Sequence, residues 1–245
     1  HVIGISATRP SFALARPMIP VRTSHPDMSG LATAAAVYCP IAGVVLSNAL
    51  YCSPLLAVLE RAKVGTMGPL NPLPAALTVL STLAWLQYGL SIANPFVVAS
   101  NVPGLAAAIT GFVLMLPLMK GENSLQMVQG AFVAGSVTTM LLWSFLVFST
   151  LSAAAWPTLL GYYAAAFFVI LCASPLSAMK QVISSKDSAS IFLPMTIAQV
   201  SNCGMWTVYG FYAVKDVFVW GPNAVGLLLG LAQVVLKVIF PSKAE

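Results

Sequence analysis

The chain consists of long apolar blocks separated by short polar stretches. Lys, Arg, Asp and Glu are absent from residues 28–59, 64–119, 123–179, 188–214 and 217–236. A membrane-spanning helix needs ~20 apolar residues, so the second and third blocks each hold two helices, broken near Asn94-Pro95 and Trp156-Pro157. The blocks do not alternate as a lipid-facing barrel would, and backbone groups in lipid must be satisfied internally, which leaves helices. The pattern predicts seven spans, at about 33–58, 72–91, 96–119, 125–149, 157–180, 191–213 and 218–239.

Parts of the chain recur at a fixed offset. Ser53-Pro54-Leu55 recurs as Ser174-Pro175-Leu176, and Tyr88-Gly89 as Tyr209-Gly210, each 121 residues later. After one inserted residue the offset becomes 122, which relates Asn101 to Asn223. A fixed offset indicates two copies of one structural unit. The copies cover the first to third and the fifth to seventh helices. Because a single unpaired helix joins them, the two units cross the membrane in the same direction.

The predicted fold is an all-α membrane protein with seven transmembrane helices, arranged as two parallel three-helix bundles joined by a linker helix (3+1+3). The helix–helix contacts of such a bundle favour small residues, and Gly226 and Gly230 form a GxxxG pattern that serves tight packing or a homo-oligomer. The expected divisions are an N-terminal tail, a first repeat, a linker helix, a second repeat and a C-terminal tail, at 1–30, 31–121, 122–150, 151–241 and 242–245.

Composition and charge support a membrane protein and suggest its orientation. Hydrophobic residues make up 59% of the chain, charged residues 7%, and the mean hydropathy is +0.90. A soluble domain carries about a quarter charged residues. The first, third and fifth links and the C-terminus carry most of the basic residues after the tail, namely Arg61, Lys63, Lys120, Lys180, Lys186, Lys237 and Lys243. The positive-inside rule places these links in the cytoplasm and the N-terminus outside. No basic cluster supports nucleic-acid binding.

The first 27 residues do not fit this orientation, because Arg9, Arg16 and Arg22 would lie outside. Three interpretations stand: a non-native extension ahead of a start at Met28, a targeting segment, or an ordinary disordered tail. None of them changes the predicted helical core.

Two symmetric pairs are candidates for substrate binding. Asn101 and Asn223 sit a few residues into equivalent helices, and an amide suits neighbouring hydroxyls without bringing a charge. The alternative is a helix–helix hydrogen bond. Trp85 and Trp206 offer a flat apolar face and one N–H donor, which suits the C–H side of a sugar ring. Packing or an interfacial belt is the alternative for these indoles. The symmetric placement of both pairs favours a pocket.

Several motifs, in order, resemble those of the SWEET sugar-transporter family. They are Cys52-Ser53-Pro54-Leu55, Ala173-Ser174-Pro175-Leu176, Trp206-Thr207-Val208-Tyr209-Gly210, Lys215-Asp216-Val217-Phe218-Val219, Pro222-Asn223-Ala224-Val225-Gly226 and Leu229-Gly230-Leu231-Ala232-Gln233. The similarity spans about residues 36–241. It implies a facilitator with a 3+1+3 arrangement that lets sugars move down their gradient. It also implies that Asn101, Asn223 and Trp206 contact sugar, whereas the family's residue at the Trp85 position is often small.

The resemblance further implies an outer gate and a set of hinges. Tyr88 and Asp216 match the family's gate pair, and a phenol donating to a carboxylate makes a contact that opens reversibly. The alternative is an interfacial Tyr88 and an Asp216 that only neutralises Lys215. The hinge candidates are Pro54, Pro74, Pro175 and Pro194, because proline removes a backbone donor and localises bending. Pro194 is displaced by two residues from the family pattern, in which Phe192 takes its place.

The mechanism that we expect follows from the residue types that the predicted spans lack. Coupled carriers keep an acid or a histidine within the bilayer, and none of the seven predicted spans has one. No acid pair, metal-ligand cluster or Ser–His arrangement indicates an enzyme, so we expect no catalytic residue, cofactor or metal. The expected function is uncoupled, bidirectional transport of a sugar, with two indoles favouring a monosaccharide. The alternatives are a carrier of another neutral solute such as an amino acid, and a seven-helix receptor. The family default is the plasma membrane, with an internal membrane as the alternative.

Overall fold

The computed structural model describes residues 30–68, 70–119 and 122–242, with side chains from residue 124 onward in the last range. Within these ranges every regular element is helical. The first repeat holds α1 (Gly30–Thr33), the π-helical turn η1 (Ala34–Tyr38), α2 (Cys39–Val64), α3 (Pro72–Ser91), α4 (Pro95–Met115) and the turn η2 (Leu116–Leu118). The linker is α5 (Glu122–Phe148). The second repeat holds the turn η3 (Ala153–Ala155), α6 (Trp156–Leu171), α7 (Ala173–Ser185), α8 (Leu193–Val208), the π-helical turn η4 (Tyr209–Val214) and α9 (Val217–Ile239).

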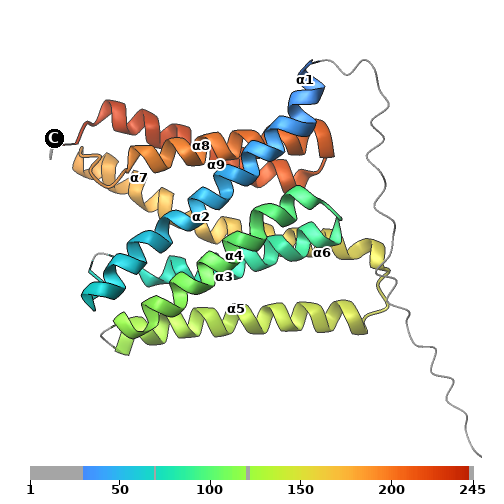
Figure 1. The fold of residues 1–245 in the computed structure, drawn as a ribbon, viewed down its shortest axis with the longest axis horizontal. Coiled ribbons are helices and arrows are strands. Elements are labelled where there is room, and N and C mark those ends of the chain that lie inside the picture. The colour runs from blue at the N-terminus through green and yellow to red at the C-terminus, as the bar shows by residue number, and fades with distance from the viewer. Residues whose placement is uncertain (1–29, 69, 120–121, 243–245) are drawn as a thin grey trace, which may run out of the picture.

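The helices run roughly along one long axis, so the bundle has two ends (Figure 1). The Tyr88 end, on the right in Figure 1, holds the α3–α4 and η4–α9 connections. The Leu70 end, on the left, holds the α2–α3 and α7–α8 connections, and the described chain finishes there. Within the described residues, six helical stretches are long and apolar enough to cross a membrane. The stretch α8–η4, which runs beside α9, completes seven.

The two repeats meet through equivalent helices. In the first repeat α4 packs against both α2 and α3, and in the second α9 packs against α8. Between the repeats, α2 contacts α8 and α3 contacts α6. The linker α5 packs mainly on α3 and is tied to α6 by Tyr163, whose hydroxyl lies 2.6 Å from the Thr139 hydroxyl. The core consists of two clusters of buried side chains. One extends from α3 and α6 to the α8–η4 stretch, and the other lies between α2, α3, α4 and α5.

Helix boundaries follow local chemistry that is visible in the sequence. The expected breaks at Asn94-Pro95 and Trp156-Pro157 are confirmed, because α4 begins at Pro95 and α6 begins at Trp156. Proline suits a first turn because its missing N–H has no partner there. The first long helix runs to Val64, beyond the predicted 58, and ends at Gly65 with a left-handed φ of 73°. Glycine takes this conformation without the steric strain of a side chain.

The fifth predicted span differs from a single helix over 157–180. It is divided at Cys172 into α6 and α7, and α7 continues to Ser185. Pro175 contributes to the division, because it cannot donate the hydrogen bond to the Leu171 carbonyl. Its repeat partner Pro54 lies inside the unbroken α2. The predictions for the N-terminal tail, Lys120 and Lys243 fall outside the described residues.

Candidate functional site

A cavity of about 690 Å³ lies between the two repeats. Its walls reach from Trp85 and Trp206 to Leu70 and Asn71 in the α2–α3 connection and to Ser190 in the α7–α8 connection. Ser190 is exposed, so the cavity opens at the Leu70 end. At the Tyr88 end it is closed by buried aromatic side chains. None of the described residues that line it is charged.

Both expected binding pairs line this cavity. Asn101 and Asn223 each donate their amide to the carbonyl one turn earlier, Val97 at 2.8 Å and Val219 at 2.7 Å. Asn101 also donates to the Ser100 hydroxyl at 3.1 Å, and its Oδ1 is buried without a hydrogen-bond partner. A buried acceptor without a partner carries a desolvation cost, which a hydroxyl donor in the cavity would remove.

The two cavity tryptophans are held differently. Trp206 is 5% exposed and donates its indole N–H to Ser47 of α2 at 3.0 Å, across the contact between the repeats. The Ser47 hydroxyl in turn donates to Asn202 at 2.9 Å. Gly43 makes room for this indole, since a Cβ there would lie 2.9 Å from Trp206 Nε1. Trp85 is partly buried, and among the described residues its indole N–H has no acceptor equivalent to Ser47.

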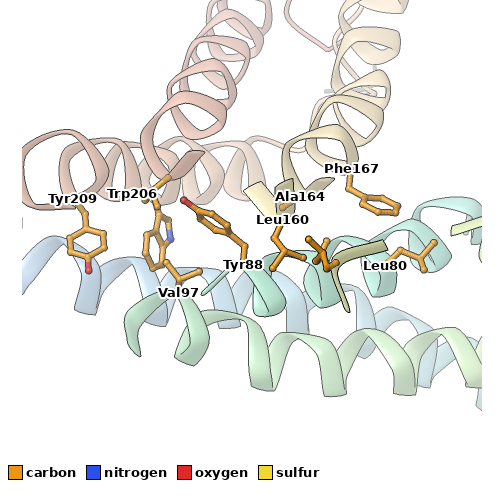
Figure 2. Close-up of a cluster of buried hydrophobic side chains, with 11 residues drawn as sticks. Leu80, Tyr88, Val97, Leu160, Ala164, Phe167, Trp206 and Tyr209 are labelled. Atoms are coloured by element: carbon orange, nitrogen blue, oxygen red, sulfur yellow. The ribbon is translucent and has the colours of Figure 1, made fainter. Parts of the chain in front are cut away.

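The Tyr88 end is closed by contacts between the repeats. Tyr88 donates its hydroxyl hydrogen bond to Asp216 Oδ2 at 2.5 Å, and Tyr88 is 1% exposed. A second contact between the repeats joins Asn94 to Tyr209, in which the Asn94 amide donates to the Tyr209 hydroxyl at 2.8 Å. Figure 2 shows Tyr88, Trp206 and Tyr209 grouped together, with Leu80 and Phe167 further along the bundle.

The four candidate hinge prolines differ in their position relative to the cavity. Pro54, Pro74 and Pro175 line the cavity, whereas Pro194 lies outside it, on a separate hollow of about 230 Å³ between α2 and α8. Phe192, which takes the family's proline position, borders both. The displacement of Pro194 in the sequence therefore has a structural counterpart.

The GxxxG pair packs within the chain. A Cβ on Gly226 would lie 2.8 Å from Cys203 Sγ, and one on Gly230 would lie 2.6 Å from Val200 Cγ2. Both neighbours belong to α8. The close approach of α9 to α8 thus uses these two glycines.

Four residues of the site were not identified from the sequence: Ser47, Asn94, Asn202 and Tyr209. Asn202 had a signal, because its equivalent at an offset of 121 is Ser81, which also lines the cavity. For Asn94 the sequence indicates only a helix break before Pro95. Ser47 had no symmetric signal, since Phe168 stands 121 residues later.

Two membrane-spanning triple-helix units around a central cavity that is closed at one end are the arrangement of transporters built from parallel repeats. Comparison with known proteins identifies the family of transporters. The family described as "Sugar efflux transporter for intercellular exchange" (MtN3_slv) matches residues 37–123 and 158–245, once for each repeat. The chain therefore belongs to the SWEET family of transporters, which confirms the resemblance found in the sequence.

Individual relatives of the chain are also SWEET transporters. The chain is 28% identical over 200 residues to the bidirectional sugar transporter SWEET7 of Arabidopsis thaliana, covering 80% of this chain and 77% of that protein. It is 26% identical over 205 residues to the sugar transporter SWEET1 of Caenorhabditis elegans, covering 82% of this chain and 64% of that protein. A solved eukaryotic SWEET transporter superposes with a TM-score of 0.75 at 22% identity, over 86% of this chain and 98% of that one. The structural likeness confirms the 3+1+3 fold.

Proposed function

We propose that this protein is a facilitative, bidirectional transporter of a monosaccharide. The observation that carries the proposal is the uncharged cavity between the repeats, which combines two tryptophans with a buried, unpartnered amide oxygen on Asn101. A sugar hydroxyl would donate to that oxygen, and an indole face would cover the C–H side of the ring. Membership of the SWEET family and the names of the relatives support a sugar as the substrate.

The two repeats would contribute unequally to recognition. In the first repeat, Asn101 Oδ1 has no hydrogen-bond partner, and among the described residues no side chain accepts from the Trp85 N–H. In the second, the Trp206 N–H is used by Ser47. We therefore propose that Trp85 and Asn101 make the directional hydrogen bonds to the substrate. Trp206 would form the closed end of the cavity, and Asn223 would add a further polar contact.

The proposed mechanism is uncoupled alternating access. The cavity opens at the Leu70 end, where Arg61, Lys63, Lys180 and Lys237 lie, and the positive-inside rule makes this end cytoplasmic. The Tyr88 end would then face outside, with Tyr88 and Asp216 as a gate. Rocking of one triple-helix unit against the other, with bending at Pro54, Pro74 and Pro175, would close one end as the other opens. We propose the plasma membrane as the site of action.

The test is counterflow of radiolabelled glucose in liposomes that contain the full chain and no ion gradient. We expect saturable exchange in the wild type and a loss of about ten-fold or more in Asn101→Ala, as one lost hydrogen bond to a substrate predicts. Thr110→Ala is the matched control, because Thr110 lies on the exposed face of the same helix α4. Exchange of none of glucose, fructose and sucrose would reject a sugar substrate and point to another neutral solute.

A further inference from the structure

The two repeats present equivalent residues at the Tyr88 end. Asn94 and Asp216 are the N-cap residues of α4 and α9, the third helix of each repeat. Asn94 Oδ1 accepts hydrogen bonds from the backbone N–H groups of Phe96 at 3.1 Å and Val97 at 3.2 Å. Asp216 Oδ1 accepts one from Phe218 at 2.9 Å. One atom of each side chain therefore fixes the start of its own helix.

The other atom of each cap reaches the opposite repeat. Asp216 Oδ2 accepts from Tyr88 of α3, and Asn94 Nδ2 donates to Tyr209 at the start of η4. Both tyrosines stand at equivalent positions, 121 residues apart. The aromatic rings around the two tyrosines are repeated as well, in edge-to-face contacts. The Tyr88 ring centroid lies 5.9 Å from that of Trp85 and 5.8 Å from that of Phe218. The Tyr209 ring centroid lies 5.8 Å from that of Trp206 and 5.7 Å from that of Phe96.

Backbone geometry brings each cap to its place. The Asn94 N–H donates to the Gly89 carbonyl at 2.9 Å, and the Asp216 N–H to the Gly210 carbonyl at 3.0 Å. Each glycine lies against the following helix. A Cβ on Gly89 would lie 2.8 Å from Val97 Cγ1, and one on Gly210 would lie 2.6 Å from the backbone nitrogen of Trp220. The Tyr-Gly pair of each repeat thus positions the cap that binds the other repeat's tyrosine.

We propose that Asn94 and Tyr209 form a second latch, equivalent to the Tyr88–Asp216 pair, and that both must break before the Tyr88 end can open. The pair crosses between units that separate at this end in the proposed rocking motion, so the inference rests on the proposed function. The two latches differ in chemistry. Tyr88 donates to an anion, which makes the stronger contact, whereas Tyr209 accepts from a neutral amide. An amide at position 94 also keeps a second negative charge away from this end.

Distances between spin labels test the latch without any substrate. Leu90 and Tyr212 are exposed residues at the Tyr88 end of the two repeats, and labels there report its opening. The full chain, with its native cysteines replaced, is labelled at both positions and measured in liposomes by pulsed electron resonance. We expect Tyr209→Phe to raise the ratio of long to short distances about five-fold, as loss of one hydrogen bond predicts. Tyr88→Phe should raise the ratio further, and the double variant should be mostly open.

Two further variants separate a latch from general packing. Ser91→Ala is the matched control, because the Ser91 hydroxyl donates to the Tyr88 carbonyl at 2.7 Å within one repeat and should leave the distances unchanged. Asn94→Asp keeps the helix cap and lets Tyr209 donate to the new carboxylate, so it should stay closed. If Tyr209→Phe gives the same distances as Ser91→Ala, or if Asn94→Asp opens as widely as Tyr209→Phe, the second latch is rejected. Because no sugar is present, either result is independent of the substrate proposed above.

Discussion

Trp206 of the second repeat donates its indole N–H to Ser47 of the first at 3.0 Å, and both side chains are buried. The same serine hydroxyl donates to Asn202 at 2.9 Å, which gives a short polar chain through the contact between α2 and α8. Each member satisfies another in an apolar setting, where unpaired polar atoms carry a desolvation cost. The position of Trp206 at the closed end of the cavity is therefore fixed by a contact between the two repeats rather than by a contact within one repeat.

Removal of the Ser47 hydroxyl should destabilise the protein. In Ser47→Ala, the Trp206 N–H and Asn202 Oδ1 lose a buried partner, and we expect a loss of about 1 kcal/mol, the size typical of hydrogen bonds between membrane helices. The measurement is the Tm of the purified protein in detergent. Ser53→Ala, an exposed position on the same helix, is the control. Equal Tm values for the two variants would show that the polar chain adds nothing to stability.

The glycines of α9 should matter for folding within one chain. In Gly230→Ala the new methyl group would lie 2.6 Å from Val200 Cγ2, so α9 must move away from α8 and the Tm should fall. Gly204→Ala is the control on α8, because nothing lies within 4 Å of its Cβ position, and there alanine should be neutral or stabilising by up to about 1 kcal/mol. A variant that keeps its Tm but changes its oligomeric state in size-exclusion chromatography would place the pair at an interface between copies instead.

The sequence predicts the fold well because the repeat is carried by residues with strong local constraints. Proline and glycine restrict backbone geometry, and charge-free blocks define spans, so helix number and the parallel arrangement follow directly. The break at Cys172 does not follow, since Pro54 and Pro175 have the same local sequence and only the second interrupts its helix. The local sequence alone therefore does not distinguish a tolerated proline from one that interrupts its helix.

From the repeat alone, site residues could be predicted only where both repeats carry them, whereas Tyr88 and Asp216 were predicted from the family resemblance. Asn101, Asn223, Trp85 and Trp206 were found by symmetry and all line the cavity. Ser47 and the Asn94–Tyr209 pair act between the repeats, and their partners change in type from one repeat to the other. Asp216 faces Tyr88 where Asn94 faces Tyr209, so a search for identical residues misses the second contact. Such asymmetric contacts become visible only when the two repeats are seen together.

The division between α6 and α7 should be needed for movement. In Pro175→Ala an N–H becomes available to the Leu171 carbonyl, so α6 and α7 should join into one stiffer helix and glucose exchange should slow several-fold. Pro157→Ala is the control, because a proline in the first turn of α6 replaces no helical hydrogen bond. Pro194→Ala should have the smaller effect of the two hinge candidates, since Pro194 lies outside the cavity. Wild-type exchange in Pro175→Ala would remove the hinge from the mechanism.

Trp85 should set the size of sugar that can pass. Its indole lines the same cavity as Trp206, whose N–H is held by Ser47. Two indoles take up more of the cavity than one, which favours a small sugar. Trp85→Ala removes that wall while it leaves Asn101 in place, so we expect sucrose uptake to appear or rise, with glucose uptake weakened because the stacking face is lost. The measurement is competitive uptake of labelled glucose and sucrose into liposomes. Trp143→Ala deletes an indole that packs on Trp156 outside the cavity and should leave the sucrose-to-glucose ratio unchanged. Equal sucrose and glucose uptake in the wild type would already contradict a monosaccharide carrier, whatever the variant does.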